Sequence, residues 1–320
     1  LKVLLQKDPE HLTARWLLNL ANMALGSDPK TIPENLSIQL DTFDSIAAFP
    51  RFLNVAGDLG LNTISLSGGV IIEDFDGDNF LDIVVSDWSP DGQLRYFRNF
   101  GDGTFSERTD EAGFTGLYGG LNLIQGDYDN DNDPDIYVLR GAWLEKVGLE
   151  YPNSLLQNDG TGKFRDVTLT AGLAKKHFPS QTASWADYNN DGNLDLYVGN
   201  ENFPSQLFHN NGDGTFSDVA RKAGILNNDF AKAVVWGDYN NDRFPDLYVS
   251  NFGGANRLYK NMQNGTFVDV ALEANVAFPY RSFPAWFWDY NNDGNLDLFV
   301  SGYEWNVKDV AADYMGLPAQ

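Results

Sequence analysis

Five short aspartate-rich segments recur along the chain at an almost constant interval, and this repeat restricts the possible folds more than any other feature. Their first residues are 74, 127, 187, 238 and 289, so consecutive segments begin 53, 60, 51 and 51 residues apart. A nearly fixed period of this length is typical of repeat architectures, in which each repeat forms one supersecondary unit. The segments read DFDGDNFLD, DYDNDNDPD, DYNNDGNLD, DYNNDRFPD and DYNNDGNLD.

The residue types in these segments predict a bound cation. Together the segments hold 18 aspartates, and carboxylates this close together repel one another unless positive charge compensates them. Ca²⁺ binds about six to eight oxygen atoms and tolerates irregular geometry. Asp or Asn at positions 1, 3 and 5, a main-chain carbonyl near position 7 and Asp at position 9 would place such oxygens around one point. A single segment could equally be an ion-free turn, but five segments in register favour the ion.

The EF-hand begins with the same spacing but is excluded by the rest of the pattern. It requires Gly at position 6 and a bidentate Glu at position 12. Here position 12 is valine in every segment, and position 6 is glycine only at Gly192 and Gly294. The residues that follow, such as LDIVV and PDLYV, are strand-like and show no helical period. The fourth segment has Arg243 at position 6, and we expect this cation to crowd the site and weaken binding there.

A second element recurs between these segments and contains a glycine-rich turn. It begins as RNFGDGTF at residue 98, QNDGTGKF at 157, HNNGDGTF at 209 and KNMQNGTF at 260, and RFLNVAGDLGL at 51–61 is a truncated copy. Such turns predict hairpins, because Asn, Asp and Gly accept positive φ. Each repeat is therefore predicted to have one strand on either side of the aspartate loop and one on either side of the hairpin. The prediction is an all-β fold, a β-propeller of four-stranded blades with five repeats visible.

These loops and hairpins resemble those of the FG-GAP or VCBS-repeat propellers, which include the head of integrin α chains, over about residues 50–305. The resemblance implies about five Ca²⁺ ions in this chain and about seven blades in the native protein, with further repeats beyond Gln320. We also expect a segment before Leu1, because the chain opens within LKVLLQK and without Met. The implied ligands are Asp74, Asp76, Asp78, Asp82, Asp127, Asp129, Asp131, Asp135, Asp187, Asn189, Asp191, Asp195, Asp238, Asn240, Asp242, Asp246, Asp289, Asn291, Asp293 and Asp297.

The first 30 residues differ in kind from the rest and are predicted to be helical. Asp8 can cap a helix that begins with Pro9. With the preceding LKVLLQK, this helix resembles part of a tetratricopeptide-type hairpin, and bacterial relatives of the cartilage acidic protein family join such a segment to calcium propellers. The predicted domains are residues 1–30 (partial tetratricopeptide-like segment), 31–50 (linker) and 51–320 (propeller). The expected apolar face of the helix contains Leu12, Trp16, Leu20, Met23 and Ala24.

The charge and composition exclude several classes of function. The chain has 45 acidic and 22 basic residues and a formal net charge of −23, which argues against nucleic acids and anionic membrane surfaces as partners. It has no cysteine for disulfides or thiolate metal sites, and no run of 18 apolar residues that could span a bilayer. Extracellular calcium modules bind at about 10⁻⁴–10⁻³ M Ca²⁺. Since this concentration exists outside the cytoplasm, we expect an extracellular, cell-surface or periplasmic protein.

The sequence contains little that indicates catalysis. His209 occupies the same repeat position as Arg98, Gln157 and Lys260, which predicts an exposed polar residue. There is no HExxH, GxSxG or P-loop motif, and the hairpins explain the GDGTF stretches. Our hypothesis is a binding or adhesion module for a protein or carbohydrate ligand. A structural subunit of a larger complex and a polysaccharide-active lyase or hydrolase stay open as alternatives.

The predicted partner-binding face lies at the end of the blades opposite the calcium loops. In a four-stranded blade the calcium loop and the hairpin emerge at one end, so the other connections share the opposite end. These connections carry one aromatic residue per repeat, and aromatic and Arg side chains on loops are frequent anchors of recognition. Packing between blades is the alternative role for the aromatic side chains. The residues are Trp88, Trp143, Phe203, Phe252 and Trp305, with Tyr280 and Arg281 from the neighbouring connection.

Overall fold

The computed structural model consists of two compact units, Leu1–Leu53 with Tyr303–Gln320 and Asn54–Gly302. Within the described residues, no helix is long and apolar enough to cross a membrane. The residues that the structure describes are 1–25, 31–38, 52–141, 151–303 and 306–308.

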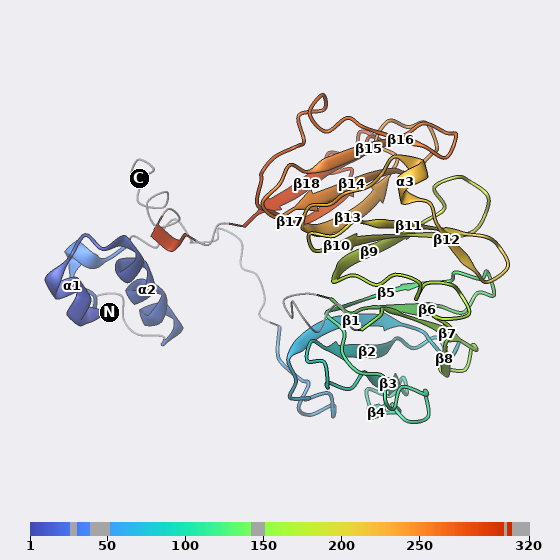
Figure 1. Ribbon diagram of the computed structural model, residues 1–320. Coiled ribbons are helices and arrows are strands. Elements are labelled where there is room, and N and C mark those ends of the chain that lie inside the picture. Colours follow the sequence, from blue (N-terminus) through green and yellow to red (C-terminus); the bar gives the residue numbers. More distant parts are fainter. Residues whose placement is uncertain (26–30, 39–51, 142–150, 304–305, 309–320) are drawn as a thin grey trace. The chain divides into compact units, whose positions relative to one another are not determined.

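The larger unit is built from antiparallel β-sheets (Figure 1). In its described part, four sheets have four strands each, and every sheet contains consecutive strands in chain order. A further sheet pairs β17 with β18 in the fifth repeat, and one short helix, α3 (Ala220–Ala223), follows β12. The strands are β1 (Ser67–Glu73), β2 (Asp82–Asp87), β3 (Arg95–Asn99), β4 (Phe105–Glu107), β5 (Asn122–Gly126), β6 (Asp135–Leu139), β7 (Ser154–Asn158), β8 (Phe164–Asp166), β9 (Ser180–Ala186), β10 (Asp195–Asn200), β11 (Gln206–Asn210), β12 (Phe216–Asp218), β13 (Ala231–Gly237), β14 (Asp246–Asn251), β15 (Arg257–Asn261), β16 (Phe267–Asp269), β17 (Ser282–Trp288) and β18 (Asp297–Gly302).

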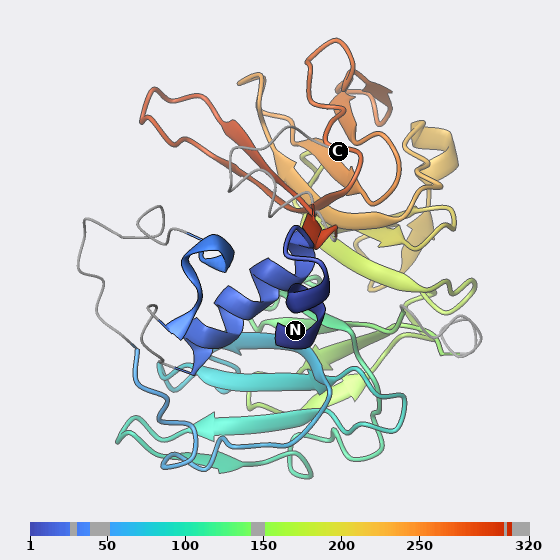
Figure 2. The same ribbon diagram turned by 90° about the vertical axis from the view of Figure 1, so that its left-hand side faces the viewer.

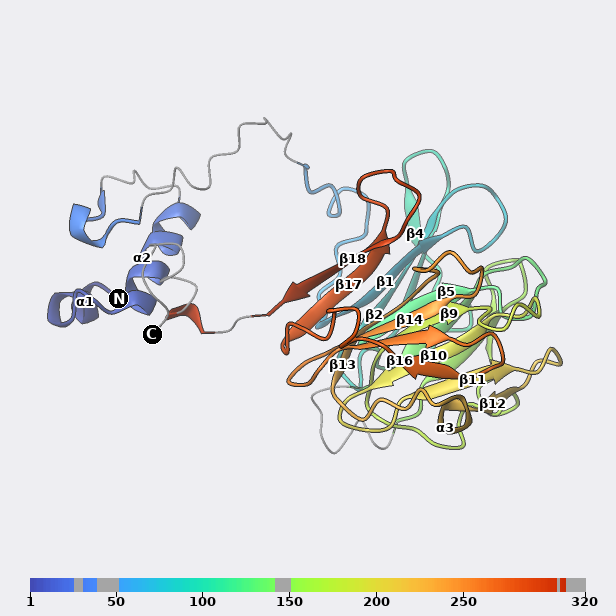
Figure 3. The same cartoon turned by 90° about the horizontal axis from the view of Figure 1, so that it is seen from above.

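Each sheet is one blade, and the blades are neighbours in the order in which they occur in the chain. The first strands contact one another in sequence: β1 with β5, β5 with β9, β9 with β13, and β13 with β17. Figure 1 shows this succession from β1–β4 in blue and cyan to β17–β18 in red. Figures 2 and 3 show from two other directions that the β17–β18 hairpin lies beside the β13–β16 sheet. The predicted β-propeller architecture of four-stranded blades is thus confirmed.

Aromatic side chains from the aspartate loops form much of the core between neighbouring blades. The residue at position 2 of a loop packs against the first residue of the fourth strand in the next blade, and both members of each pair are buried. The aspartate loop is therefore anchored in the core on one side, which fixes where its carboxylates lie. The pairs and the distances between their ring centroids are Phe75–Phe164 at 5.4 Å, Tyr128–Phe216 at 5.7 Å and Tyr188–Phe267 at 5.7 Å.

The turn that follows the fourth strand of a blade is also present at residues 55–61, ahead of β1. Leu59 N donates to Val55 O at 3.1 Å, and Leu61 N donates to Ala56 O at 2.9 Å. The truncated repeat at 51–61 therefore has the turn of the complete repeats over its described part. The corresponding bonds after β4 are Ala112 N to Arg108 O and Phe114 N to Thr109 O, both at 2.9 Å.

In the smaller unit, helix α2 (Leu12–Ala24) begins later than predicted. Its N-cap is His11, whose Nδ1 accepts a hydrogen bond from Ala14 N at 3.3 Å. The predicted cap, Asp8, instead ends helix α1 (Lys2–Lys7) as its C-cap residue. The prediction was wrong because a residue that closes one helix was assigned to the start of the next.

The buried face of α2 also differs from the predicted one. Leu12 is buried as expected, but Leu20 and Met23 are 42% and 47% exposed. Helix α1 and the chain around the 3₁₀ turn Glu34–Leu36 cover the other side of α2, and sequence periodicity does not indicate which side receives them. The core of this unit contains Leu5, Ala14, Leu18 and Ile32, with Leu36 packed against it.

Residues 31–38, predicted as the start of a linker, pack on α2. Asn19 is buried, and its Nδ2 donates to Leu36 O at 2.9 Å. Its Oδ1 accepts from Ile38 N at 3.0 Å. The limits of the predicted domains and the tetratricopeptide-like character of the helices stay predictions.

Candidate metal centres

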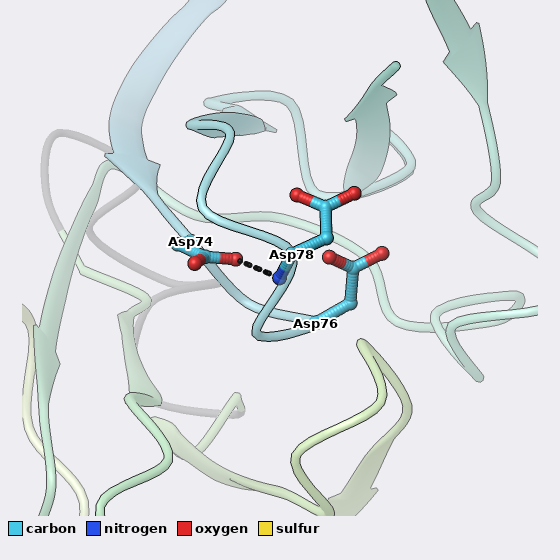
Figure 4. Close-up of side chains that lie close together, drawn as sticks. All are labelled: Asp74, Asp76 and Asp78. Atoms are coloured by element: carbon cyan, nitrogen blue, oxygen red, sulfur yellow. Dashed lines mark hydrogen bonds between the residues drawn. The ribbon is translucent and has the colours of Figure 1, made fainter. Parts of the chain in front are cut away.

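Each aspartate loop is held by the same set of hydrogen bonds from its own backbone. In the first loop, Asp74 Oδ1 accepts from Asp78 N at 3.1 Å (Figure 4) and Asp74 Oδ2 accepts from Asn79 N at 2.8 Å. Asp78 Oδ1 accepts from Phe80 N at 2.9 Å. The four other loops contain the same three bonds between positions 1 and 5, 1 and 6, and 5 and 7. Each segment therefore builds its own loop conformation, as short polar side chains can.

Two positions of every loop adopt left-handed backbone conformations. Positions 4 and 6 have φ between 58° and 90°, which explains why nine of these ten residues are Asn or Gly. Position 6 of the fourth loop is the exception, since Arg243 has φ 71°. Arg243 is exposed, and within the described residues it forms no ion pair with a carboxylate of its loop. The predicted crowding by Arg243 is therefore not seen, and weaker binding by this loop stays a prediction.

The first two loops bring three carboxylates each within reach of one ion. In both loops, one oxygen from each of three aspartates lies within 4.8 Å of the other two. In Figure 4 the carboxylates of Asp76 and Asp78 lie side by side. Such a cluster of oxygens matches the ligand type that Ca²⁺ prefers. The two groups are Asp74, Asp76 and Asp78, and Asp127, Asp129 and Asp135.

In the third to fifth loops, an asparagine at position 3 lies beside the residue at position 5. Asn189 Nδ2 donates to Asp191 Oδ2 at 2.8 Å, and the same bond in the fifth loop measures 3.0 Å. Asn240 Oδ1 accepts from Asp242 N at 3.0 Å. The structure thus brings the side chains of positions 1, 3 and 5 together in these loops as well, with an amide oxygen in place of one carboxylate.

Four buried carboxylate oxygens in these loops accept no hydrogen bond from the described part of the chain. They are Asp76 Oδ1, Asp129 Oδ1, Asp195 Oδ2 and Asp246 Oδ2. A buried carboxylate oxygen without a partner is unfavourable, because it has lost its hydrogen bonds to water and forms none within the protein. A cation held by several oxygens removes this cost. The donor set and its unpartnered oxygens therefore fit Ca²⁺.

Burial also shifts the pKa values of several loop aspartates. Burial raises the pKa of Asp135 to about 8 and that of Asp246 to about 6. Burial also raises the pKa values of Asp129 and Asp195. In the protein alone these carboxylates thus resist ionisation, and a bound cation would favour their charged form.

The aspartate at position 9 connects each loop to the third strand of its blade. In the first four blades it is at most 1% exposed, and its Oδ1 accepts a hydrogen bond from the backbone of the asparagine that ends the third strand. In the fifth loop, Asp297 Oδ2 accepts from Tyr290 N at 3.1 Å. Position 9 is therefore a structural junction as well as a predicted ligand. The four bonds are Asn99 N to Asp82 at 2.7 Å, Asn158 N to Asp135 at 2.8 Å, Asn210 N to Asp195 at 2.8 Å and Asn261 N to Asp246 at 2.7 Å.

The residue just before this asparagine lies against the loop, which the sequence analysis missed. Arg98 Nε is 2.5 Å from Asp76 Oδ2, and Arg98 Nη2 donates to Asp78 Oδ2 at 3.1 Å. Gln157 Nε2 donates to Asp129 Oδ2 at 2.6 Å.

The third loop has a related contact, since His209 Nδ1 lies 3.0 Å from Asp195 Oδ1. Describing this repeat position as simply exposed and polar was therefore wrong. The available signal was its place in the chain, one residue before the asparagine that binds the position 9 aspartate.

The predicted partner-binding residues are partly described by the structure. Tyr280 is 55% exposed, and Arg281 pairs with Phe252 in an isolated β-bridge between neighbouring connections. Trp88 and Phe203 are half-buried. Trp143 and Trp305 lie outside the described residues.

Two of the predicted aromatic residues pack against other aromatic side chains. Phe203 stacks on Phe178 with ring centroids 5.4 Å apart, and Phe252 meets Phe230 edge-on at 6.1 Å. Lys232 Nζ lies 4.1 Å from the centroid of the Phe230 ring. These contacts give Phe203 and Phe252 a packing role, whereas a binding role for this face stays a prediction.

Comparison with protein families gives one match along most of the propeller unit. A family model described as FG-GAP-like repeat matches residues 74–138, 147–198, 187–249 and 238–300. Three of the four ranges begin at the first residue of an aspartate loop, and all four end in the second strand of a blade, so the matches follow the period of the loops.

Among curated proteins, the chain is similar to cartilage acidic protein 1. The human and mouse proteins are each 29% identical over 202 residues, and the alignment covers 59% of this chain and 30% of theirs. The Xenopus tropicalis protein is 28% identical over 202 residues, with 60% and 30% covered. The alignment thus spans about 30% of the length of these relatives.

Solved structures with partial similarity include a lectin and a matrix protein. The lectin is from Agrocybe aegerita and is described as recognising non-reducing terminal N-acetylglucosamine. It has 18% identity and a TM-score of 0.40, with 72% of this chain and 56% of the lectin covered. The V. cholerae biofilm matrix protein Bap1 has 16% identity and a TM-score of 0.42, with 74% and 35% covered.

Proposed function

This chain belongs to the FG-GAP-like repeat family, and we propose that it is a calcium-binding, extracytoplasmic β-propeller that acts as a binding or adhesion module. Its partner would be a protein or a carbohydrate. In each loop the residues at positions 1, 3, 5 and 9 and the carbonyl of position 7 would hold the ion. The ion would supply the positive charge that compensates the carboxylates. Five ions would change the formal charge from −23 to about −13.

The observation that carries the calcium proposal is the set of buried, unpartnered carboxylate oxygens within preformed loops. The backbone bonds of each loop fix the carboxylate at position 1 against positions 5 and 6. Asp76, Asp129, Asp195 and Asp246 each retain a buried oxygen that accepts no hydrogen bond in the described chain. A turn that served only to connect two strands would not need such oxygens.

An extracytoplasmic location is supported by two arguments. The curated relatives carry the name of cartilage, an extracellular tissue. Calcium sites of extracellular modules have Kd values of about 10⁻⁴–10⁻³ M and would be filled only where Ca²⁺ reaches millimolar concentration.

Metal analysis combined with thermal unfolding tests the calcium proposal. We expect about five Ca²⁺ per chain after dialysis against ~1 mM Ca²⁺, and a lower melting temperature after chelation with EDTA. With a Kd of ~10⁻⁴ M, each ion would stabilise the folded chain by about 1.4 kcal/mol at ~1 mM Ca²⁺. Absence of bound metal, together with a melting temperature that EDTA does not change, would contradict the proposal.

The partner-binding face can be tested with exposed side chains at its rim. We expect the Tyr280→Ala/Arg281→Ala double variant to lose retention on a panel of immobilised matrix proteins and glycans, in buffer containing Ca²⁺. The matched control is Tyr290→Ala, because Tyr290 is 63% exposed but belongs to the fifth aspartate loop. Equal retention of the double variant and the unchanged chain, or loss of retention in the Tyr290 variant alone, would contradict this placement of the face.

A further inference from the structure

Two carboxylates of the first aspartate loop form ion pairs with an arginine of the protein itself. Arg98 reaches from β3 and contacts two predicted ligands, Asp76 and Asp78, at 2.5 Å and 3.1 Å. In the part of the chain that the structure describes, no other Arg or Lys lies within ion-pair distance of an aspartate loop. At the same repeat position the second loop has the neutral Gln157, which donates a single hydrogen bond to Asp129.

The contacts of Arg98 use oxygens that a cation in this loop would need. The Asp76 side chain is 8% exposed and that of Asp78 is 27% exposed, so both carboxylates are shielded from most of the solvent. A guanidinium beside these oxygens repels Ca²⁺, and its Nη2 group occupies a lone pair of Asp78 Oδ2 with a hydrogen bond. Ca²⁺ would therefore have to compete with the Arg98 guanidinium in the first loop.

While it pairs with Asp76 and Asp78, Arg98 also lies over an aromatic ring. Its guanidinium carbon is 5.5 Å from the centroid of the Phe100 ring, at the start of the adjoining hairpin. The Nε atom is buried, but the side chain as a whole is 38% exposed, so a change of rotamer can move the guanidinium toward the solvent while it stays near this ring. A cation–π contact of this kind would retain part of the stabilisation that Arg98 loses on leaving the carboxylates.

We propose that Arg98 is an internal competitor for the calcium position of the first loop. It compensates Asp76 and Asp78 when Ca²⁺ is scarce and is displaced when Ca²⁺ binds. The first loop consequently fills at a higher Ca²⁺ concentration than the second, third and fifth loops. This inference rests on the proposed calcium function and adds a graded response to it.

Backbone amide resonances can follow each loop separately during a Ca²⁺ titration. Gly77 lies in the first loop, Asn130 in the second, Gly192 in the third and Gly294 in the fifth, so their amide shifts report the filling of each loop. In the unchanged protein we expect the Gly77 midpoint at about five- to tenfold higher Ca²⁺ than the Gly192 midpoint, the effect of one partly exposed guanidinium held by two carboxylates.

Three variants isolate the contribution of Arg98. Arg98→Gln introduces the residue found in the second loop and should bring the Gly77 midpoint close to that of Gly192. The matched control is Arg95→Gln, which removes an equal charge from the same strand, where Arg95 pairs with Glu107. It should leave the Gly77 midpoint unchanged. Gln157→Arg should have the reverse effect and raise the midpoint of the second loop about five- to tenfold.

The outcomes separate the two proposals. Equal midpoints for Gly77 and Gly192 in the unchanged protein, with no effect of Arg98→Gln, would overturn the Arg98 proposal and leave the calcium function standing. The same shift in Arg95→Gln as in Arg98→Gln would also overturn it, because the effect would then be one of net charge. No Ca²⁺-dependent shift in any of these amides would overturn both proposals.

Discussion

At the residue scale, the aspartate at position 9 of the third loop combines a structural task with a proposed ligand role. Asp195 is fully buried, and one of its oxygens accepts hydrogen bonds that fix the third strand. Its other oxygen accepts none from the described chain and faces the proposed ion. Replacing the carboxylate by a neutral amide separates the two tasks. An amide oxygen still accepts the hydrogen bond from Asn210 N, but it binds Ca²⁺ less strongly.

We therefore expect Asp195→Asn to bind one Ca²⁺ fewer per chain than the unchanged protein. In Ca²⁺ its melting temperature should fall by about 3 °C, the consequence of losing one site. In EDTA the order should reverse or the difference vanish, because the variant no longer buries a carboxylate that burial disfavours. Metal analysis and calorimetry in both buffers measure this.

Asp213→Asn is the control for this substitution. Asp213 lies in the neighbouring hairpin, where it accepts hydrogen bonds from Thr215 and touches no aspartate loop. An unchanged metal content in Asp195→Asn would show that Asp195 is not a ligand.

At the element scale, the asparagine that ends the third strand joins one blade to the loop of the preceding blade. Asn210 is 2% exposed, and its Nδ2 donates to Tyr128 O at 2.7 Å across the blade interface. Asn158 and Asn261 make the equivalent bonds to Phe75 O and Tyr188 O. The position of one calcium loop therefore depends on the hairpin of the next blade, and neighbouring blades are expected to unfold together.

Removing the cross-blade hydrogen bond of Asn210 should destabilise the protein. Asn210→Ala leaves the buried carbonyls of Tyr128 and Leu194 without their donor, which should destabilise the protein by about 1–3 kcal/mol. Asn211→Ala changes the exposed next residue and should cost less than about 0.5 kcal/mol. Urea unfolding of both variants in EDTA measures the difference free of any contribution from Ca²⁺. Equal stabilities would show that the cross-blade bond contributes nothing.

At the scale of the whole molecule, we expect the aspartate loops to make stability depend on both Ca²⁺ and protons. The folded state raises the pKa of Asp135 to about 8 and that of Asp246 to about 6, while ordinary aspartates in an unfolded chain titrate near 4. Between these values the folded state binds more protons than the unfolded state, so the ion-free fold loses stability as pH rises. Bound Ca²⁺ would hold the same carboxylates in their charged form and abolish this dependence.

The melting temperature of the EDTA-treated protein should consequently rise as pH is lowered from about 8 to about 5, the window set by these pKa values. In Ca²⁺ the same scan should be nearly flat. Asp135→Asn removes the carboxylate whose pKa is raised to about 8 and should flatten the EDTA scan over its upper half. A melting temperature in EDTA that falls steadily on acidification would contradict the electrostatic account of the loops.

Much of the fold and of the aspartate loops could be predicted from the sequence, because both depend on interactions between residues close together in the chain. The hydrogen bonds that shape a loop connect residues within six positions, and hairpin turns depend on single residues such as Gly101 and Gly103 that accept positive φ. Five copies of the same pattern then made the period, the four-strand repeat and the predicted ligands visible.

The tertiary structure decided which residues meet across strands and helices. The sequence drew attention to Arg243, which is within a loop but exposed, and not to Arg98, which reaches the first loop from β3, about 20 residues away. It also gave the wrong cap and buried face for α2, because these depend on where α1 ends and on which side the chain at residues 31–38 packs. Periodicity specifies that a face is apolar, but the contact that covers it is set by chain segments distant in sequence, whose packing is decided only when the whole core forms.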